Sequence, residues 1–259
     1  MSDSAIPAAH RAIDLRAVEG GVVAWLEDDF HHFGIELGHD GATVISVEGI
    51  AERYPRDTCP GAVGILQELV GMPLTESATA LGQYTDMRWH CTHLYDLLGL
   101  AIAHAAAGRQ HRRYHAVVPD RQIPTHIDWD QPIGGSTAPV LYRDGEEVMA
   151  WEVEDNTIVG PDRYAGISLG RGFRQWTESL DVDEGEAAHV LRRATLIALG
   201  RLIDMQALPD EGVPANRGAC HSFQPEVAKR SSRVIASTRD YSDHPDDLLA
   251  NLESSGSGL

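Results

Sequence analysis

The chain has 259 residues, a formal net charge of −18, and 42% hydrophobic and 23% charged residues, which is an ordinary composition for one large or two small globular domains. The acidic excess argues against nucleic acid and anionic membranes as partners, because both bind basic surfaces. The sequence has neither an apolar run long enough to span a bilayer nor a signal-peptide pattern, so we expect a cytoplasmic protein.

The first part of the chain reads as a lead-in, a β meander and two helices. Residues 1–18 mix small and charged types and are predicted to be flexible. Alternating apolar stretches predict antiparallel strands at 22–26, 33–37 and 43–47. Asp40-Gly41 tolerates the positive φ of a tight hairpin turn. Apolar periodicity and terminal glycines predict helices at 61–70, and from residue 88 or 92 to 107.

The second part continues with strands and ends in helices. Strands are expected at 114–118, 140–142 and 148–153, and a long and a short helix at 184–207 and 225–236. No linker is apparent, so we predict one α+β domain over 19–253 and a disordered tail at 254–259. Its architecture would be an antiparallel meander with hairpins, packed against three or four helices.

Signatures of common cofactors are missing. The sequence contains no GxxxxGKS/T loop and no strand–GxGxxG–helix pattern, and Lys229 is its only lysine. These absences argue against P-loop, dinucleotide and pyridoxal-type chemistry. The three cysteines are odd in number and widely spaced, which favours reduced thiols over disulfides or a zinc ribbon. We therefore expect no cofactor.

The most informative stretch runs from His90 to Asp96. It places imidazole, thiol, phenol and carboxylate at the start of an apolar helix. Titratable groups in apolar surroundings are costly unless paired, so they often mark a site. Asp96 lies three residues after His93 and would orient it as a general base. The alternative is that His93 is a core histidine satisfied by a backbone carbonyl.

Two other segments add histidines. Strand alternation directs His31 and His32 to opposite faces, so at most one of them joins a pocket. The acidic run 27–29 just before them is interpreted as solvated surface. His221 follows Cys220 in a loop between apolar segments, where functional groups are often held, but neighbouring side chains diverge.

The remaining candidates would bind the substrate. Cys59 precedes Pro60, and a thiol near a helix start has a lowered pKa; Cys91 would share this environment if the next helix begins at Thr92. The alternative to a reactive thiol is that Cys59 is only a small residue packed in a turn. The candidate substrate-binding residues are Tyr95, Arg56, Cys59, Cys91 and Cys220, and Arg56 or Tyr95 would stabilise developing negative charge.

The stretches Cys59-Pro60-Gly61-Ala62 and Cys91-Thr92-His93-Leu94-Tyr95-Asp96-Leu97-Leu98 resemble those of an uncharacterised bacterial family, a domain of unknown function with a Cys-Thr-His-Leu helix motif. A histidine just before a strand, as at His31 or His32, is also similar. The resemblance covers roughly residues 20–110. It implies that Cys91, His93 and Asp96 are family features, and it implies no particular reaction.

These observations lead to three functional hypotheses. The first is a cofactor-independent acid–base enzyme, a lyase or hydrolase acting on a small apolar or aromatic hydroxy or carbonyl compound, with His93 as base and His31, His32 or His221 as proton donor. The second is a zinc or iron hydrolase with ligands from His93, one of His31 or His32, and His221 or Asp96. The third is a non-catalytic small-molecule-binding protein. A homo-oligomer is left open.

Overall fold

The computed structural model describes residues 6–121, 134–203 and 219–254. The strands are β1 (Ala8–Val18), β2 (Gly21–Asp28), β3 (His32–His39), β4 (Val44–Arg53), β5 (His111–Pro119), β6 (Ser136–Thr137), β7 (Val140–Arg143), β8 (Glu146–Ala150), β9 (Glu152–Glu154) and β10 (Thr157–Gly160). The α-helices are α1 (Thr92–Ala106), α2 (Phe173–Thr177), α3 (Val182–Ala198), α4 (Pro225–Ala228) and α5 (Ala250–Ser254). The 3₁₀ helices are η1 (Cys59–Ala62), η2 (Gly64–Leu69), η3 (Ala80–Gln83), η4 (Met87–Trp89), η5 (Asp162–Tyr164), η6 (Leu199–Leu202), η8 (His221–Phe223) and η9 (Pro245–Asp247).

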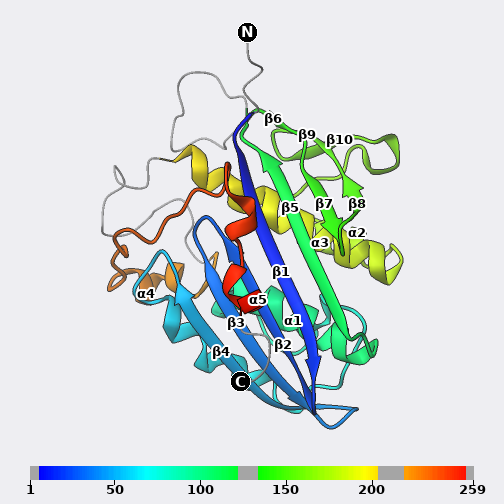
Figure 1. Cartoon of the computed structure of the whole chain (residues 1–259), viewed down its shortest axis with the longest axis vertical. Coiled ribbons are helices and arrows are strands. Elements are labelled where there is room, and N and C mark those ends of the chain that lie inside the picture. Colours follow the sequence, from blue (N-terminus) through cyan, green and yellow to red (C-terminus); the bar gives the residue numbers. More distant parts are fainter. Residues whose placement is uncertain (1–5, 122–133, 204–218, 255–259) are drawn as a thin grey trace. The chain divides into compact units, whose positions relative to one another are not determined.

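The strands form two sheets. A seven-stranded antiparallel sheet has the order β4-β3-β2-β1-β5-β7-β8, and a three-stranded sheet has the order β10-β9-β6 (Figure 1). Helical residues make up 34% and strand residues 31% of the part of the chain that the structure describes, so the predicted α+β class is confirmed. No helix among the described residues has the length and apolarity needed to cross a bilayer.

The chain divides into two compact units with interleaved segments. The first combines Met1–Arg11, Tyr114–Ala207 and Asp240–Leu248, and the second combines Ala12–Arg113, Leu208–Arg239 and Leu249–Leu259. β1 and β5 contribute residues to both units. The single domain expected over 19–253 stays a prediction.

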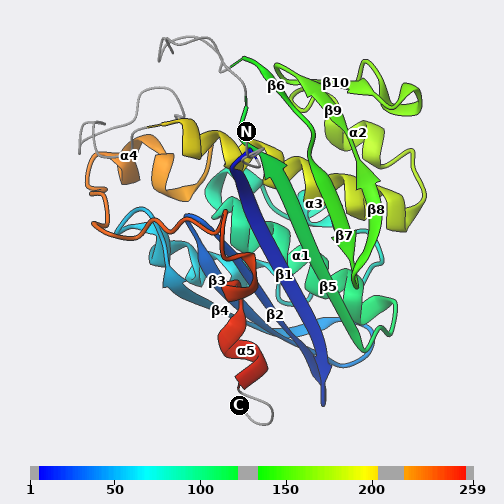
Figure 2. The same cartoon turned by 45° about the horizontal axis from the view of Figure 1, so that its top comes forward.

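The core of the second unit lies between the meander and α1. β2, β3 and β4 pair in sequence, and α1 packs across β2 and β3 (Figures 1 and 2). The helix packs closely because Gly99 has no side chain: a Cβ there would lie 2.1 Å from the carbonyl oxygen of Ala78. Leu94, Leu97 and Leu98 are fully buried, and each contributes about 1.5–3 kcal/mol through removal of apolar surface from water.

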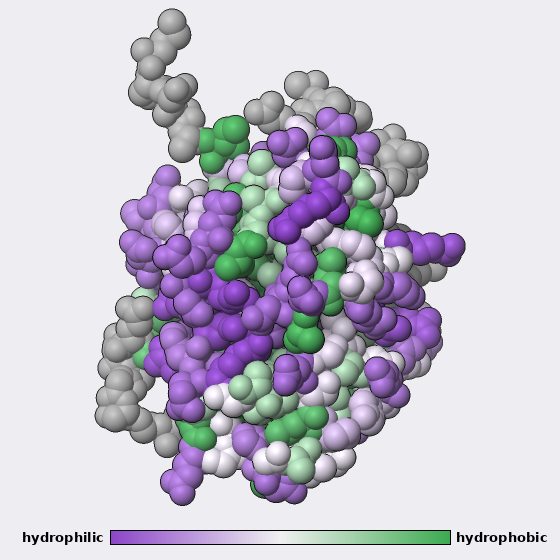
Figure 3. All heavy atoms as spheres, turned by 90° about the vertical axis from the view of Figure 1, so that its right-hand side faces the viewer, coloured by the Kyte–Doolittle hydropathy of each residue, from purple (hydrophilic) through white to green (hydrophobic). Residues whose placement is uncertain are grey.

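In the first unit, α3 packs against the β7–β8 hairpin (Figure 2). The hairpin turns through Asp144 and Gly145, which both have the positive φ typical of a tight Asp-Gly turn. The buried phenol of Tyr114 donates a hydrogen bond to the carboxylate of Glu186 on α3. Hydrophilic side chains predominate on the face shown in Figure 3, with apolar residues between them in small groups.

The predicted meander, the helix ending near residue 107 and the strand at 114–118 are confirmed, but the first residues of the chain are not a flexible lead-in. Residues 8–18 form β1, whose first eight residues are buried, and residues 1–5 lie outside the described part. The alternation of small, apolar and charged residues there fits a strand covered on both faces. The residues beyond 254 in the expected tail also lie outside the described part.

Several helix and strand predictions need correction. The expected helix at 61–70 is instead η1 and η2, because Pro60, Gly61 and Gly64 disfavour continuous α-helix. The strand at 148–153 is divided at Trp151 between β8 and β9, which belong to different sheets. α3 gives way to η6 at Leu199, and only 225–228 of the last expected helix is α-helical. Residues 204–207 lie outside the described part.

Candidate functional site

The candidate site starts at the turn between β2 and β3. Oδ1 of Asp28 accepts hydrogen bonds from the backbone N–H groups of Phe30 and His31, both at 2.9 Å. The N–H of Asp28 in turn donates to the carbonyl of His31, also at 2.9 Å. An aspartate at the first position of a turn commonly makes such bonds, which fix the following residues relative to its carboxylate. The turn therefore places the ring of His31 beside Asp28.

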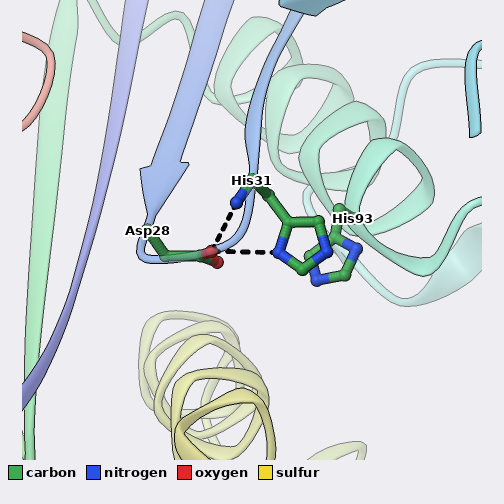
Figure 4. Close-up of side chains that lie close together, drawn as sticks. All are labelled: Asp28, His31 and His93. Atoms are coloured by element: carbon green, nitrogen blue, oxygen red, sulfur yellow. Dashed lines mark hydrogen bonds and ion pairs between the residues drawn. The ribbon is translucent and has the colours of Figure 1, made fainter. Parts of the chain in front are cut away.

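Two imidazole rings and one carboxylate meet at this turn. Nδ1 of His31 lies 2.9 Å from Oδ1 of Asp28, and the ring of His93 stacks on that of His31 with 3.7 Å between centroids and 26° between planes (Figure 4). Exposure is 2% for Asp28, 8% for His31 and 7% for His93. Because a carboxylate only accepts, Nδ1 of His31 donates this hydrogen bond, which leaves Nε2 with the lone pair.

Local structure explains how His93 reaches the turn. α1 begins after its N-cap Cys91, so His93 is in the first turn of the helix, and α1 packs on β2 and β3. The ring of Phe33 stacks near both imidazoles, 5.8 Å from His31 and 6.0 Å from His93. Phe30 contacts His31 edge-on at 6.2 Å. The cluster thus combines aromatic surroundings with three polar side chains.

Arg53 at the end of β4 holds the turn. Its guanidinium donates to the carbonyl oxygens of Asp28 at 2.7 Å and Asp29 at 2.9 Å. It also forms an ion pair with Glu27 at 3.1 Å. Five donors in a planar fork suit arginine to bind several carbonyls and a carboxylate together. The acidic run 27–29 is accordingly buried, and its interpretation as solvated surface was wrong.

Asp28 is a carboxylate that binds an imidazole of this cluster, that of His31. The expected contact between Asp96 and His93 stays a prediction. Asp96 is buried on α1, one turn after His93. The sequence analysis missed Asp28 because it weighed the acidic run only by charge. Its position at a strand end, three residues before a histidine, is the signal that could have identified it.

Two predicted histidines lie outside the cluster. The ring of His32 packs edge-on against Trp25 at 5.3 Å, and Nδ1 lies 3.6 Å from Glu27. His221 is in η8, where its backbone N–H donates to the backbone carbonyl of His90 at 2.9 Å. Burial lowers the pKa of both His32 and His221.

The thiols do not have the environment expected of nucleophiles. Burial raises the pKa of Cys59, whose Sγ accepts a hydrogen bond from Ser222 at 3.3 Å. Burial also raises the pKa of Cys91, and this outweighs the opposite effect of the neighbouring backbone N–H groups. Cys91 Sγ lies 3.8 Å from Nδ1 of His93. The expectation of lowered pKa values was wrong because these helix starts are buried. Cys220 is half-buried, and all three cysteines are free.

The remaining substrate-binding candidates lie within the packed structure. Tyr95 is buried, and its ring centroid is 5.1 Å from that of His90. Arg56 is buried and donates to the carbonyl of Ser231 at 3.5 Å. His90 is fully buried, with Nε2 3.0 Å from Oγ1 of Thr85, and burial lowers its pKa.

The three clustered residues also form a group of metal-ligand type. One ligand atom from each of Asp28, His31 and His93 lies within 4.8 Å of the others, and no other such group occurs in the part of the chain that the structure describes. Ring nitrogens coordinate an ion in the ring plane, and the planes of the two stacked rings are nearly parallel. Binding both rings to one ion therefore requires one of them to turn.

Comparison with known proteins adds no functional information. No family model and no curated protein matches this sequence.

Proposed function

We propose that the chain is a cofactor-independent enzyme that catalyses proton transfer, a lyase or hydrolase acting on a small apolar or aromatic compound with hydroxyl or carbonyl groups. The observation that carries the proposal is the hydrogen bond between Asp28 and His31, with His93 stacked on the same ring. An imidazole held by a carboxylate through one nitrogen presents the other as a base, as in catalytic triads of unrelated folds.

In the proposed reaction, Nε2 of His31 removes a proton from water, a hydroxyl group or a carbon next to a carbonyl. Asp28 keeps the ring oriented and stabilises the imidazolium that forms. His93 supplies a proton to the leaving group or the carbonyl oxygen. Two stacked imidazolium rings would repel each other, so the pair works with one added proton that passes from one ring to the other during the cycle.

The surroundings support an apolar or aromatic substrate. Phe30 and Phe33 flank the imidazoles, and aromatic rings pack favourably on other flat rings. The carboxylate of Asp28 faces the two rings, and its Oδ1 already accepts three hydrogen bonds. This carboxylate would repel an anionic substrate group.

A second candidate function is a metal-dependent hydrolase, supported by the ligand atoms of Asp28, His31 and His93 within 4.8 Å. Two histidines and one carboxylate are a common ligand set for zinc or iron. Such an ion would supply an activated water molecule. The set contains His93 and His31, as one of the sets expected from the sequence does, but Asp28 takes the place of His221 or Asp96, and His32 does not belong to it.

The test is a substrate panel followed by NMR in D2O. Aryl and alkyl esters, β-hydroxy carbonyl compounds and aryl ketones report hydrolysis, dehydration and α-proton exchange in one measurement. We expect turnover of at least one class by the wild-type protein and a loss of about 100-fold or more in His31→Gln and His93→Gln. His39→Gln, at the far end of β3, is the matched control and keeps wild-type turnover.

Two results would overturn the acid–base proposal. One is the absence of turnover with the whole panel, and the other is turnover that survives in both cluster variants. Activity that EDTA abolishes and Zn²⁺ or Fe²⁺ restores, with one metal ion bound per chain, would instead support the metal-dependent hydrolase.

A further inference from the structure

A second pair of histidines occurs in the first unit of the chain. Nδ1 of His10 on β1 lies 3.0 Å from Nε2 of His115 on β5, and the ring centroids are 5.2 Å apart. His10 is 8% exposed and His115 is half-buried. Neither residue was singled out by the sequence, because β1 was expected to be a flexible lead-in. The pair has no part in the proposed acid–base chemistry.

The separation of the two nitrogens matches the bite of a chelate. Imidazole nitrogens coordinate transition metals at about 2.0–2.1 Å. With 3.0 Å between the nitrogens, an ion bound to both would subtend an angle of about 95°. This angle is close to the 90° of square-planar or tetragonal coordination and well below the tetrahedral angle. Cu²⁺ and Ni²⁺ prefer such geometry with nitrogen ligands, whereas zinc prefers tetrahedral sites.

We propose that His10 and His115 form a bidentate site for a divalent transition-metal ion with square-planar preference, Cu²⁺ or Ni²⁺. The ion replaces the hydrogen bond between the rings and binds Nδ1 of His10 and Nε2 of His115. Water molecules complete its coordination. Each ring turns as the ion enters, and the partial exposure of His115 provides the access that this needs.

The protonation state of His10 and the local charge favour binding of the ion. Burial and the neighbouring His115 lower the pKa of His10 to about 4, so that His10 is neutral near pH 7 and need not lose a proton to bind. The proton shared by the two facing nitrogens moves to the far nitrogen of its own ring, and no net proton is released. Arg201 is close enough to affect His10, but it is paired with Asp120 and Asp240, which leaves a local charge of −1.

The test is titration of the full chain with Cu²⁺ in a buffer that contains glycine as a competing chelator. We expect one tight site whose electron paramagnetic resonance spectrum shows coupling to two imidazole nitrogens. His115→Gln and His10→Gln each weaken binding at least tenfold. His244→Gln is the matched control, because His244 is an exposed histidine of the same unit, and it changes the affinity less than twofold.

The proposal is overturned if both variants keep the wild-type affinity, or if the folded wild-type protein binds Cu²⁺ through fewer than two imidazoles. The spectrum of the wild type decides this even if a variant fails to fold. A tight site that disappears in His31→Gln and persists in His115→Gln would place the ion at the Asp28 cluster and would also overturn the proposal.

Discussion

The two histidine pairs of this protein differ in how their rings meet. At the β2–β3 turn, His31 and His93 stack face to face at 3.7 Å, and a carboxylate binds one of them. In the other pair, His10 and His115 meet through their ring nitrogens at 3.0 Å. The nitrogens of the stacked rings point outward in two nearly parallel planes. In the other pair, one nitrogen of each ring points toward the other ring. The first arrangement suits the proton transfer that we propose, and the second suits the chelation that we propose.

The pairs also differ in what holds them. Asp28 and Arg53 fix the backbone and the ring orientation of His31 through buried hydrogen bonds. His10 and His115 are held by neighbouring strands and by each other. A site that depends on a buried polar network should be sensitive to loss of any member, whereas a pair on regular strands should tolerate substitution.

The largest effect is expected for Asp28→Ala. The substitution removes the acceptor of three buried donors and should lower the free energy of unfolding by about 3–5 kcal/mol. Asp40→Ala is the matched control, since Oδ1 of Asp40 accepts the same two turn bonds, from Ala42 and Thr43, in an exposed turn. Its loss should be clearly smaller, because water can satisfy the exposed backbone groups. Equal losses in urea denaturation would contradict the importance of burial.

Arg53→Ala should lower the free energy of unfolding by about 2–4 kcal/mol, because it leaves buried carbonyl groups and Glu27 without their cation. Arg88→Ala removes an exposed arginine paired with Asp86 and should change the free energy of unfolding much less. We also expect Arg53→Ala to reduce turnover through displacement of the β2–β3 turn. Normal turnover in a folded Arg53→Ala protein would show that Arg53 does not position His31.

The pH dependence of stability should report on the second pair. The folded-state pKa of His10 is about 4, below the usual 6.5, so the unfolded chain binds the additional proton between these values. The contribution of neutral His10 to the free energy of unfolding is therefore fully present above about pH 6.5. It is lost as the pH drops toward 4, and the loss is roughly 1–3 kcal/mol. Urea denaturation at several pH values measures this slope. His10→Gln should reduce it, and an unchanged slope would assign the effect to other groups.

The smallest effect is expected for His32→Gln. His32 packs against Trp25 and Glu27, so the variant should keep turnover within about twofold, whereas His31→Gln should lower turnover about 100-fold or more. The two variants differ by one position along the chain. Comparable losses of turnover in both variants would contradict the assignment of the site to His31 alone of these two histidines.

The fold was largely predictable where the pattern is local. The meander strands, α1 and the β7–β8 hairpin follow from alternation, helical periodicity and Asp-Gly turns. The exceptions have local causes as well. Glycines converted the helix expected at 61–70 into 3₁₀ segments, and Trp151 ends β8 where the pattern continues.

The candidate site was predictable in part. His93 and His31 were both named from the sequence, but their contact joins a helix to a hairpin turn 62 positions away, and no periodicity specifies such a contact. The sequence analysis assigned Asp28 to the surface because of its charge. Its burial depends on Arg53 and α1, which are distant in the sequence.

The sequence by itself determined the class of the fold, the end of α1 and the residue types available for chemistry, because these depend on neighbours within a few positions. Only the tertiary structure decided which carboxylate binds an imidazole, that burial raises the pKa of Cys59 and Cys91, and that His10 meets His115. Desolvation and pairing depend on segments that are distant along the chain, and folding alone brings these segments together.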